Sequence, residues 1–125
     1  FMLDLERVVK IGDLFSIYGS LLTDKQQETV KLYYFNDLSL GEIAEHKDIS
    51  RQAVYDNLQR SEETLKSYEQ ELGLAKYSKL LRTEVDKLEQ VIEKISPKLE
   101  SAEICKLEEI KKRLETYQEG DFDDF

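Results

Sequence analysis

Apolar residues recur every three or four positions along most of the chain, the spacing that places side chains on one face of an α-helix. In the first segment, Leu14 and Tyr18 follow this spacing and predict an amphipathic helix that ends near Gly19. The next segment carries Val30 and Tyr34 in the same way. Because the period is that of helices and not of strands, the sequence predicts an all-α protein.

Paired polar residues mark where two of the helices begin. Thr23 is followed three positions later by Gln26, and Ser39 in the same way by Glu42. In such a capping box, each side chain accepts a hydrogen bond from the backbone N–H of the other residue. We therefore expect helices to begin directly after Thr23 and after Ser39.

A longer helix is expected over residues 51–72. Ser50 before it is a residue of the N-cap type, and Gly73 after it is the residue most common just beyond a helix C-terminus. Val54 and Leu58 lie on one side of this helix and are expected to face a core.

The last third of the chain has a different pattern. Its apolar residues alternate steps of four and three, as in the seam of a coiled coil or helical hairpin; they are Leu81, Val85, Leu88, Ile92 and Ile95. Pro97 cannot continue a helix but can start one, so a second helix is expected after it. This pair has two possible packings, an intramolecular hairpin against residues 104–117 or a bundle between two copies of the protein.

Residues 38–60, LSLGEIAEHKDISRQAVYDNLQR, have the spacing of a helix-turn-helix. Such a motif needs a small residue where its helices cross, apolar residues that fix the crossing, and a turn residue that tolerates left-handed backbone. Ala44 is the small residue, and Asp48 occupies the turn position where glycine is usual. The apolar residues expected to be buried at the crossing are Ile43, Ile49 and Val54.

The second helix of this motif would present polar side chains outward. Arginine can form paired hydrogen bonds with guanine and glutamine with adenine, and amides at a helix N-terminus can hold a phosphate. The candidate nucleic-acid-binding residues are Lys47, Ser50, Arg51, Gln52, Tyr55, Asp56, Gln59 and Arg60. The alternative interpretation is that these are solvated polar residues of an ordinary helical hairpin.

Residues 21–72 resemble the YlxM family of small bacterial proteins, whose core is similar to the DNA-binding fourth region of sigma factors. The resemblance rests on the elements LTDKQ, YY.ND.SL.EIAE and SRQAVYDN..R.E..L..YE. It implies a cytoplasmic regulator with a sigma region 4-like or winged-helix-like helix-turn-helix domain, linked to the signal recognition particle pathway. It assigns the reading of DNA to Arg51, Gln52 and Tyr55, and it fades after Gly73.

The predicted organisation has three parts. Residues 2–73 form the helix-turn-helix domain, residues 76–118 form a C-terminal helical pair that is expected to make the protein a homodimer, and residues 119–125 form an acidic tail. Phe1 precedes Met2. We expect Met2 to be the natural start of the chain.

The charge of the chain weakens the case for unaided DNA binding. The formal net charge is −9, and residues 1–75 hold 8 Lys and Arg against 14 Asp and Glu. Binding to duplex DNA is driven largely by release of counterions from phosphates, so a binder normally presents a basic face. Two hypotheses follow: a DNA-binding regulator that acts as a dimer, or an accessory factor that docks a basic partner such as the protein or RNA-bound form of the signal recognition particle.

An enzyme is the hypothesis ranked last. The sequence shows no nucleophile with its base, no set of metal ligands and no phosphate-binding loop, so neither a metal nor a cofactor is expected. The single cysteine, Cys105, cannot form an internal disulfide, and no apolar stretch is long enough to span a bilayer. We therefore expect a cytoplasmic protein without membrane insertion.

Overall fold

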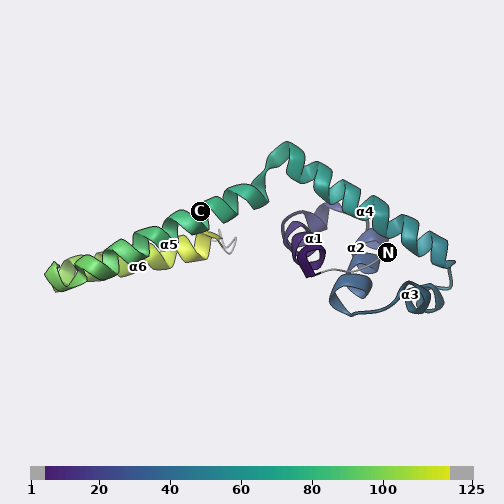
Figure 1. The fold of residues 1–125 in the computed structure, drawn as a ribbon, viewed down its shortest axis with the longest axis horizontal. Helices are drawn as coiled ribbons and strands as arrows, with labels where there is room; N and C mark the ends of the chain where they lie inside the picture. The colour runs from purple at the N-terminus through teal and green to yellow at the C-terminus, as the bar shows by residue number, and fades with distance from the viewer. Residues whose placement is uncertain (1–4, 119–125) are drawn as a thin grey trace. The chain divides into compact units, whose positions relative to one another are not determined.

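The structure is a computed structural model that describes residues 5–118, and within this range it contains helices and no strands (Figure 1). The predicted all-α class and helix-turn-helix are confirmed. Residues 2–4 of the predicted first domain and the predicted acidic tail, residues 119–125, lie outside the described residues. The helices are α1 (Leu5–Tyr18), α2 (Asp24–Val30), α3 (Leu40–Lys47), α4 (Arg51–Leu72), α5 (Leu74–Ile95) and α6 (Ser101–Gln118).

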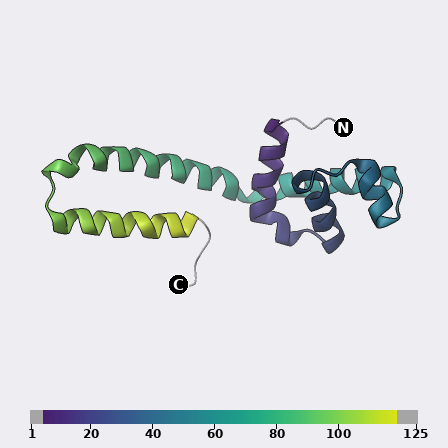
Figure 2. The same ribbon diagram turned by 90° about the horizontal axis from the view of Figure 1, so that it is seen from below.

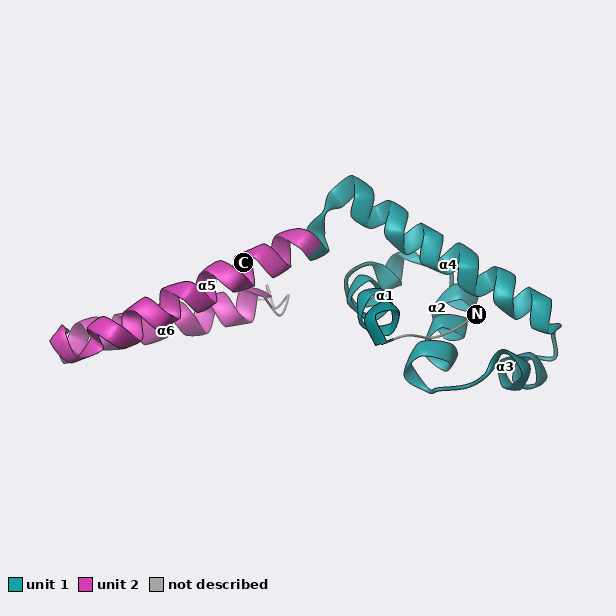
Figure 3. Ribbon diagram, in the orientation of Figure 1, with its two compact units in different colours: residues 1–75 teal, residues 76–125 magenta. Residues whose placement is uncertain are grey.

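The chain divides into two compact units, residues 1–75 and residues 76–125 (Figure 3). The first unit holds α1 to α4. The second holds nearly all of α5 together with α6.

The first unit is built around α4, against which α1, α2 and α3 all pack. Each of these helices turns apolar side chains toward a single core, which removes them from water and supplies most of the stability of a unit this small. The core residues with no more than 3% of their surface exposed are Ile11, Leu14, Tyr18, Val30, Ile43, Val54, Leu58 and Leu65.

Side-chain caps fix where the helices begin. Thr23 Oγ1 accepts a hydrogen bond from the Gln26 N–H at 3.2 Å, and Ser39 Oγ accepts one from the Glu42 N–H at 3.1 Å. Both capping boxes are closed by the return bond from the cap N–H to the Gln26 or Glu42 side chain. Ser50 Oγ caps α4 by accepting from the backbone N–H three residues later, at 3.0 Å. The predicted helix starts are confirmed.

A π-helical turn, η2 (Lys31–Phe35), follows α2 and was not predicted. Its wider ring is closed by the Asn36 N–H, which donates to the Lys31 carbonyl at 3.0 Å. Within this turn the adjacent Tyr33 and Tyr34 are both buried, while Phe35 remains 53% exposed.

A buried carboxylate joins three segments that are distant in the sequence. Glu62 of α4 has a side chain that is only 5% exposed. It accepts hydrogen bonds from the Arg7 guanidinium of α1 and from the Tyr34 hydroxyl of η2. Both Glu62 oxygens are therefore used to hold α1 and η2 against α4.

A second polar cluster lies at the end of α4. The buried Tyr18 hydroxyl donates to Glu69 Oε1 at 2.7 Å and accepts from the Leu74 N–H at 3.1 Å. The Ala75 N–H donates to the same Glu69 oxygen at 2.9 Å. Burial, together with the bond to Glu69, raises the pKa of Tyr18. The cluster satisfies the first backbone N–H groups of α5, which begins directly after Gly73 in left-handed conformation (φ 65°).

The second unit is an antiparallel hairpin of α5 and α6 (Figure 2). The chain reverses through a 3₁₀ turn, η3 (Ser96–Lys98), which carries Pro97 in its first turn. Val85 is the best buried side chain described in this unit, at 8% exposure. Lys111 Nζ and Glu89 Oε1 approach to 3.9 Å across the hairpin.

The predicted seam of α5 is only partly used inside the hairpin. Val85 is buried and Ile92 is half-buried, but Leu81, Leu88 and Ile95 remain exposed. The hairpin is therefore present, and the apolar pattern extends beyond what α6 covers.

Candidate nucleic-acid interface

The turn between α3 and α4 depends on a left-handed residue. Asp48 has φ 55° and ψ 48°, as the sequence pattern predicts. This conformation reverses the chain, so that the Ile49 N–H donates to the Ala44 carbonyl at 3.0 Å and α4 begins two residues later.

Replacing Asp48 with Gly is expected to raise the free energy of unfolding by about 0.5–1 kcal/mol, because glycine adopts the left-handed region without steric cost. Asp48→Asn should change stability much less, since asparagine keeps the Cβ and tolerates this region nearly as well. Urea denaturation of both variants measures the difference. Equal stabilisation by the two substitutions would instead assign the effect to the lost charge.

The crossing of α3 and α4 is closed by buried side chains. Ile43 and Val54 are fully buried, and Ala44, at 7% exposure, allows the two helices to approach closely. Ile49 does not belong to this set: it is 44% exposed, so the prediction that it is buried at the crossing is wrong. Ile49 follows the left-handed residue at the outside of the turn, where only its backbone is held against α3.

The outer face of α4 is defined here as the candidate residues on the first three turns of the helix, Arg51, Gln52, Tyr55, Asp56, Gln59 and Arg60. All are exposed except Tyr55, which is half-buried and not fully outward as the sequence indicated. Gln52 Nε2 donates to Asp56 Oδ1 at 2.9 Å, so Asp56 orients one of the two glutamines. Within residues 5–118, no ion pair is formed by Arg51 or Arg60.

Lys47 lies beside this face but is engaged elsewhere. Its Nζ contacts Glu28 Oε2 of α2 at 2.9 Å, and its side chain is only 15% exposed. The hydrogen bond and the charge of Lys47 lower the pKa of Glu28. The cation predicted for a phosphate contact is therefore already paired with a carboxylate of the same chain.

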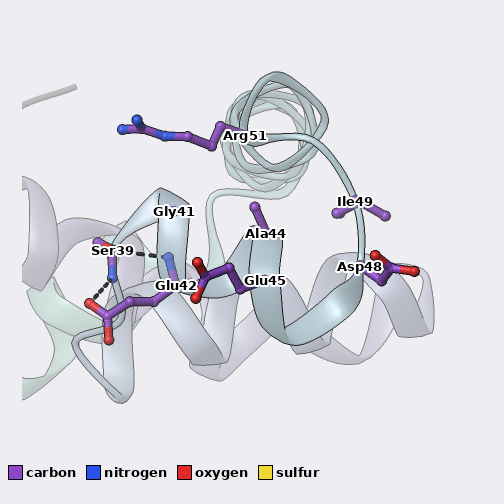
Figure 4. Close-up of a pocket in the computed structure, with 8 residues that line it drawn as sticks. All are labelled: Ser39, Gly41, Glu42, Ala44, Glu45, Asp48, Ile49 and Arg51. Carbon is purple, nitrogen blue, oxygen red and sulfur yellow. Dashed lines mark hydrogen bonds between the residues drawn. The ribbon is translucent and has the colours of Figure 1, made fainter.

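A hollow of about 600 Å³ lies between α3 and the start of α4 (Figure 4). We call it the acidic groove, because Glu42, Glu45 and Asp48 line it together with the single cation Arg51. Figure 4 shows the Arg51 side chain extending from the start of α4 toward Gly41. A Cβ at Gly41 would lie 3.8 Å from Arg51 Nε, so the guanidinium stem passes closely over α3.

A further hollow, between α2 and α4, contains a cation that the sequence pattern did not indicate. Lys25 at the start of α2 lines it together with Arg60 and Asp56. The capping box at Thr23 predicts where α2 begins, but nothing local to Lys25 indicates that α2 packs beside the outer face of α4. Lys25 and Arg60 are the cations of this hollow, with Asp56 as the acidic neighbour.

Two features of the described residues concern membrane insertion and metal binding. No helix within residues 5–118 is long and apolar enough to cross a membrane. In the same part of the chain, no three His, Cys, Asp or Glu side chains gather into a metal-binding cluster.

Comparison with known proteins places the chain among helix-turn-helix proteins. Residues 5–113 match the family UPF0122, described as "Putative helix-turn-helix protein, YlxM / p13 like". The chain is 48% identical over 103 residues to a UPF0122 protein of Thermoanaerobacter sp. (strain X514), covering 82% of this chain and 88% of the relative. It is 46% identical over 104 residues to one from Halalkalibacterium halodurans, with coverages of 82% and 92%. A Bacillus cereus (strain AH187) relative is 50% identical over 88 residues, with coverages of 70% and 80%.

Proposed function

Because the chain belongs to the UPF0122 family of YlxM / p13-like helix-turn-helix proteins, we propose that it is a DNA-binding regulator that inserts the outer face of α4 into the major groove. The observation that supports this proposal is how α4 packs on the first unit. Val54 and Leu58 anchor it in the core, while Arg51 and Gln52 on its first turn are exposed. Helix-turn-helix proteins dock with the first residues of their second helix against base edges.

Most residues of the outer face have an expected contact with DNA, and Asp56 is expected to orient Gln52. Arg51 is suited to paired hydrogen bonds with guanine, and Gln52 or Gln59 to paired bonds with adenine. Arg60 is expected to contact the phosphate backbone, assisted by Lys25 across the hollow that they share. The amides after Ser50 are suited to a phosphate at the helix N-terminus, Tyr55 to a flanking contact, and Lys47 to a weaker one because of its pair with Glu28.

The charge of this surface favours binding by two copies of the protein. Three carboxylates line the groove beside Arg51, so a single α4 offers little net attraction to phosphates. A homodimer would place two such helices on half-sites about 34 Å apart and add their weak affinities. We therefore propose a cytoplasmic dimer that acts without catalysis, cofactor or metal.

A second candidate function is favoured by the acidic groove itself. Glu42, Glu45 and Asp48 line it together with the apolar residues Ala44 and Ile49. Such a surface suits a basic protein segment, because opposite charge steers association. On this hypothesis the protein is an accessory factor of the signal recognition particle that binds the particle's protein, or that protein with its RNA, without binding DNA tightly.

Selection of duplexes from a randomised pool, followed by fluorescence anisotropy at two salt concentrations, tests the proposal. We expect a selected duplex whose binding weakens steeply with salt, and Arg51→Ala should weaken it by about tenfold or more. Arg113→Ala, which removes the same charge from an exposed site on α6, is the control and should have little effect. Failure to select any duplex, with binding to the particle's protein that Arg51→Ala leaves unchanged, would favour the accessory factor.

A further inference from the structure

The exposed side of α5 carries an apolar stripe with coiled-coil spacing. Positions 77, 81, 84, 88, 91 and 95 alternate steps of four and three, the spacing that keeps side chains along one seam of paired helices. Five of these positions hold exposed Tyr77, Leu81, Leu88, Val91 and Ile95, with exposures from 37% to 66%. The remaining position is Glu84.

This stripe is separate from the side of α5 that faces α6. Val85, Glu89 and Ile92 are covered or half-covered in the hairpin, and they lie on a neighbouring side of the helix at their own steps of three and four. Leu80 on α5 and Ile110 on α6 add further exposed apolar surface, at 58% and 44%. The hairpin therefore has an inner face that it fills itself and an outer apolar stripe that it leaves in water.

We propose that a second copy of the chain covers this stripe, so that two α5 helices pack antiparallel about a two-fold axis and the two hairpins form a four-helix bundle. An exposed apolar patch larger than about 300–600 Å² is uncommon on a monomer, whereas stable dimers bury about 800 Å² on each partner. On this chain, exposed aromatic and aliphatic side chains follow one another along about five helical turns.

The charges of α5 select the antiparallel orientation. Residues 76–82 carry Lys76, Lys79 and Arg82 and no acidic residue, whereas residues 83–95 carry four acidic residues and two lysines. An antiparallel pair places the basic half of each helix alongside the acidic half of the other, while a parallel pair places like charges together. Opposite charges across the interface favour the first arrangement, since they fix register and partner orientation.

The antiparallel register also matches the stripe residue by residue. A two-fold axis near position 86 brings Tyr77 opposite Ile95 of the second copy and Leu81 opposite Val91 of the second copy. Glu84 then lies near the axis opposite Leu88 of the second copy, and it keeps its own ion pair with Lys87 at 3.2 Å. A polar group at one seam position fixes register at some cost in stability.

Light scattering on the full chain across a dilution series tests the dimer. We expect a mass of twice 14.7 kDa, and Leu88→Glu should raise the dimer dissociation constant by more than about 100-fold, because each copy would bury an unpaired carboxylate. Gln90→Glu introduces the same charge on the opposite side of α5 and should leave the dimer intact. Circular dichroism verifies that both variants remain helical. A monomeric parent chain, or equal dimerisation by the two variants, would overturn the proposal.

Disulfide trapping tests the orientation, with Cys105→Ser in every chain. An equal mixture of Leu81→Cys and Val91→Cys proteins should form a disulfide-linked heterodimer, while either protein alone should crosslink poorly. Efficient crosslinking of each variant with itself would show a parallel pair and overturn the antiparallel arrangement. The dimer would supply the two copies that the proposed DNA binding needs. Neither test uses nucleic acid, so a failure of the dimer proposal can be distinguished from a failure of the DNA-binding proposal.

Discussion

Replacing Leu58 with Ala is expected to lower the free energy of unfolding by about 3 kcal/mol. Leu58 is fully buried where α4 packs into the core of the first unit. Removing its branched end leaves a cavity that the surrounding helices can close only in part, and the lost packing adds to the lost burial of apolar surface. Urea denaturation followed by circular dichroism measures the change.

The exposed neighbour Gln59 provides the matched control for this variant. Gln59→Ala is expected to change stability by no more than about 0.5 kcal/mol, because its side chain lies in water. The same substitution is expected to weaken DNA binding, whereas Leu58→Ala should do so only to the extent that it unfolds the protein. If Leu58→Ala proved as mild as Gln59→Ala, the packing of α4 described above would be incorrect.

Removal of the Glu62 carboxylate should have the second large effect, a loss of about 2–3 kcal/mol in the free energy of unfolding for Glu62→Ala. The substitution leaves the buried Tyr34 hydroxyl and the partly exposed Arg7 guanidinium without the acceptor that now joins them. Buried polar groups that lose their partner keep the cost of leaving water without its compensation. Chemical denaturation at neutral pH measures the loss.

Two further substitutions show whether the effect arises from this network. Glu63→Ala removes the adjacent, exposed carboxylate and is expected to change stability by less than about 0.5 kcal/mol. Glu62→Gln keeps the shape and one acceptor, so its effect should fall between those of Glu62→Ala and Glu63→Ala. Comparable stability of Glu62→Ala and Glu63→Ala would refute the role assigned to the network.

The features that the sequence predicted well are those decided by neighbouring residues. The capping boxes that begin α2 and α3 need only two residues three positions apart, and both form as expected. The left-handed Asp48 and the glycine that ends α4 are likewise local choices of backbone conformation. The apolar period of α4 predicted its buried side, because a helix that packs on a core must turn one side inward.

The features that were missed depend on residues that are far apart in the chain. The burial of Glu62 becomes favourable only because Arg7, 55 residues earlier, reaches it. Ile49 was expected to be buried at the crossing because it is an apolar residue of the motif, but the direction of the turn leaves it at the surface. Lys25 became part of the candidate site only when the packing of α2 beside α4 was known.

The apolar stripe of α5 shows the same limit in another form. The sequence indicated a seam but could not distinguish contact within one chain from contact between two. The hairpin separates these possibilities for individual residues, since Val85 lies inside it and Leu88 lies outside. Light scattering on the full chain tests whether a second copy covers Leu88.

The central claim, that the outer face of α4 binds duplex DNA, is tested most directly by NMR mapping. Amide resonances of the isotopically labelled full chain would be followed during titration with the selected duplex. We predict that the largest shift changes fall on residues 50–60 and weaken in Arg51→Ala. Changes confined to the α5–α6 hairpin, or no changes at any duplex concentration, would contradict the claim.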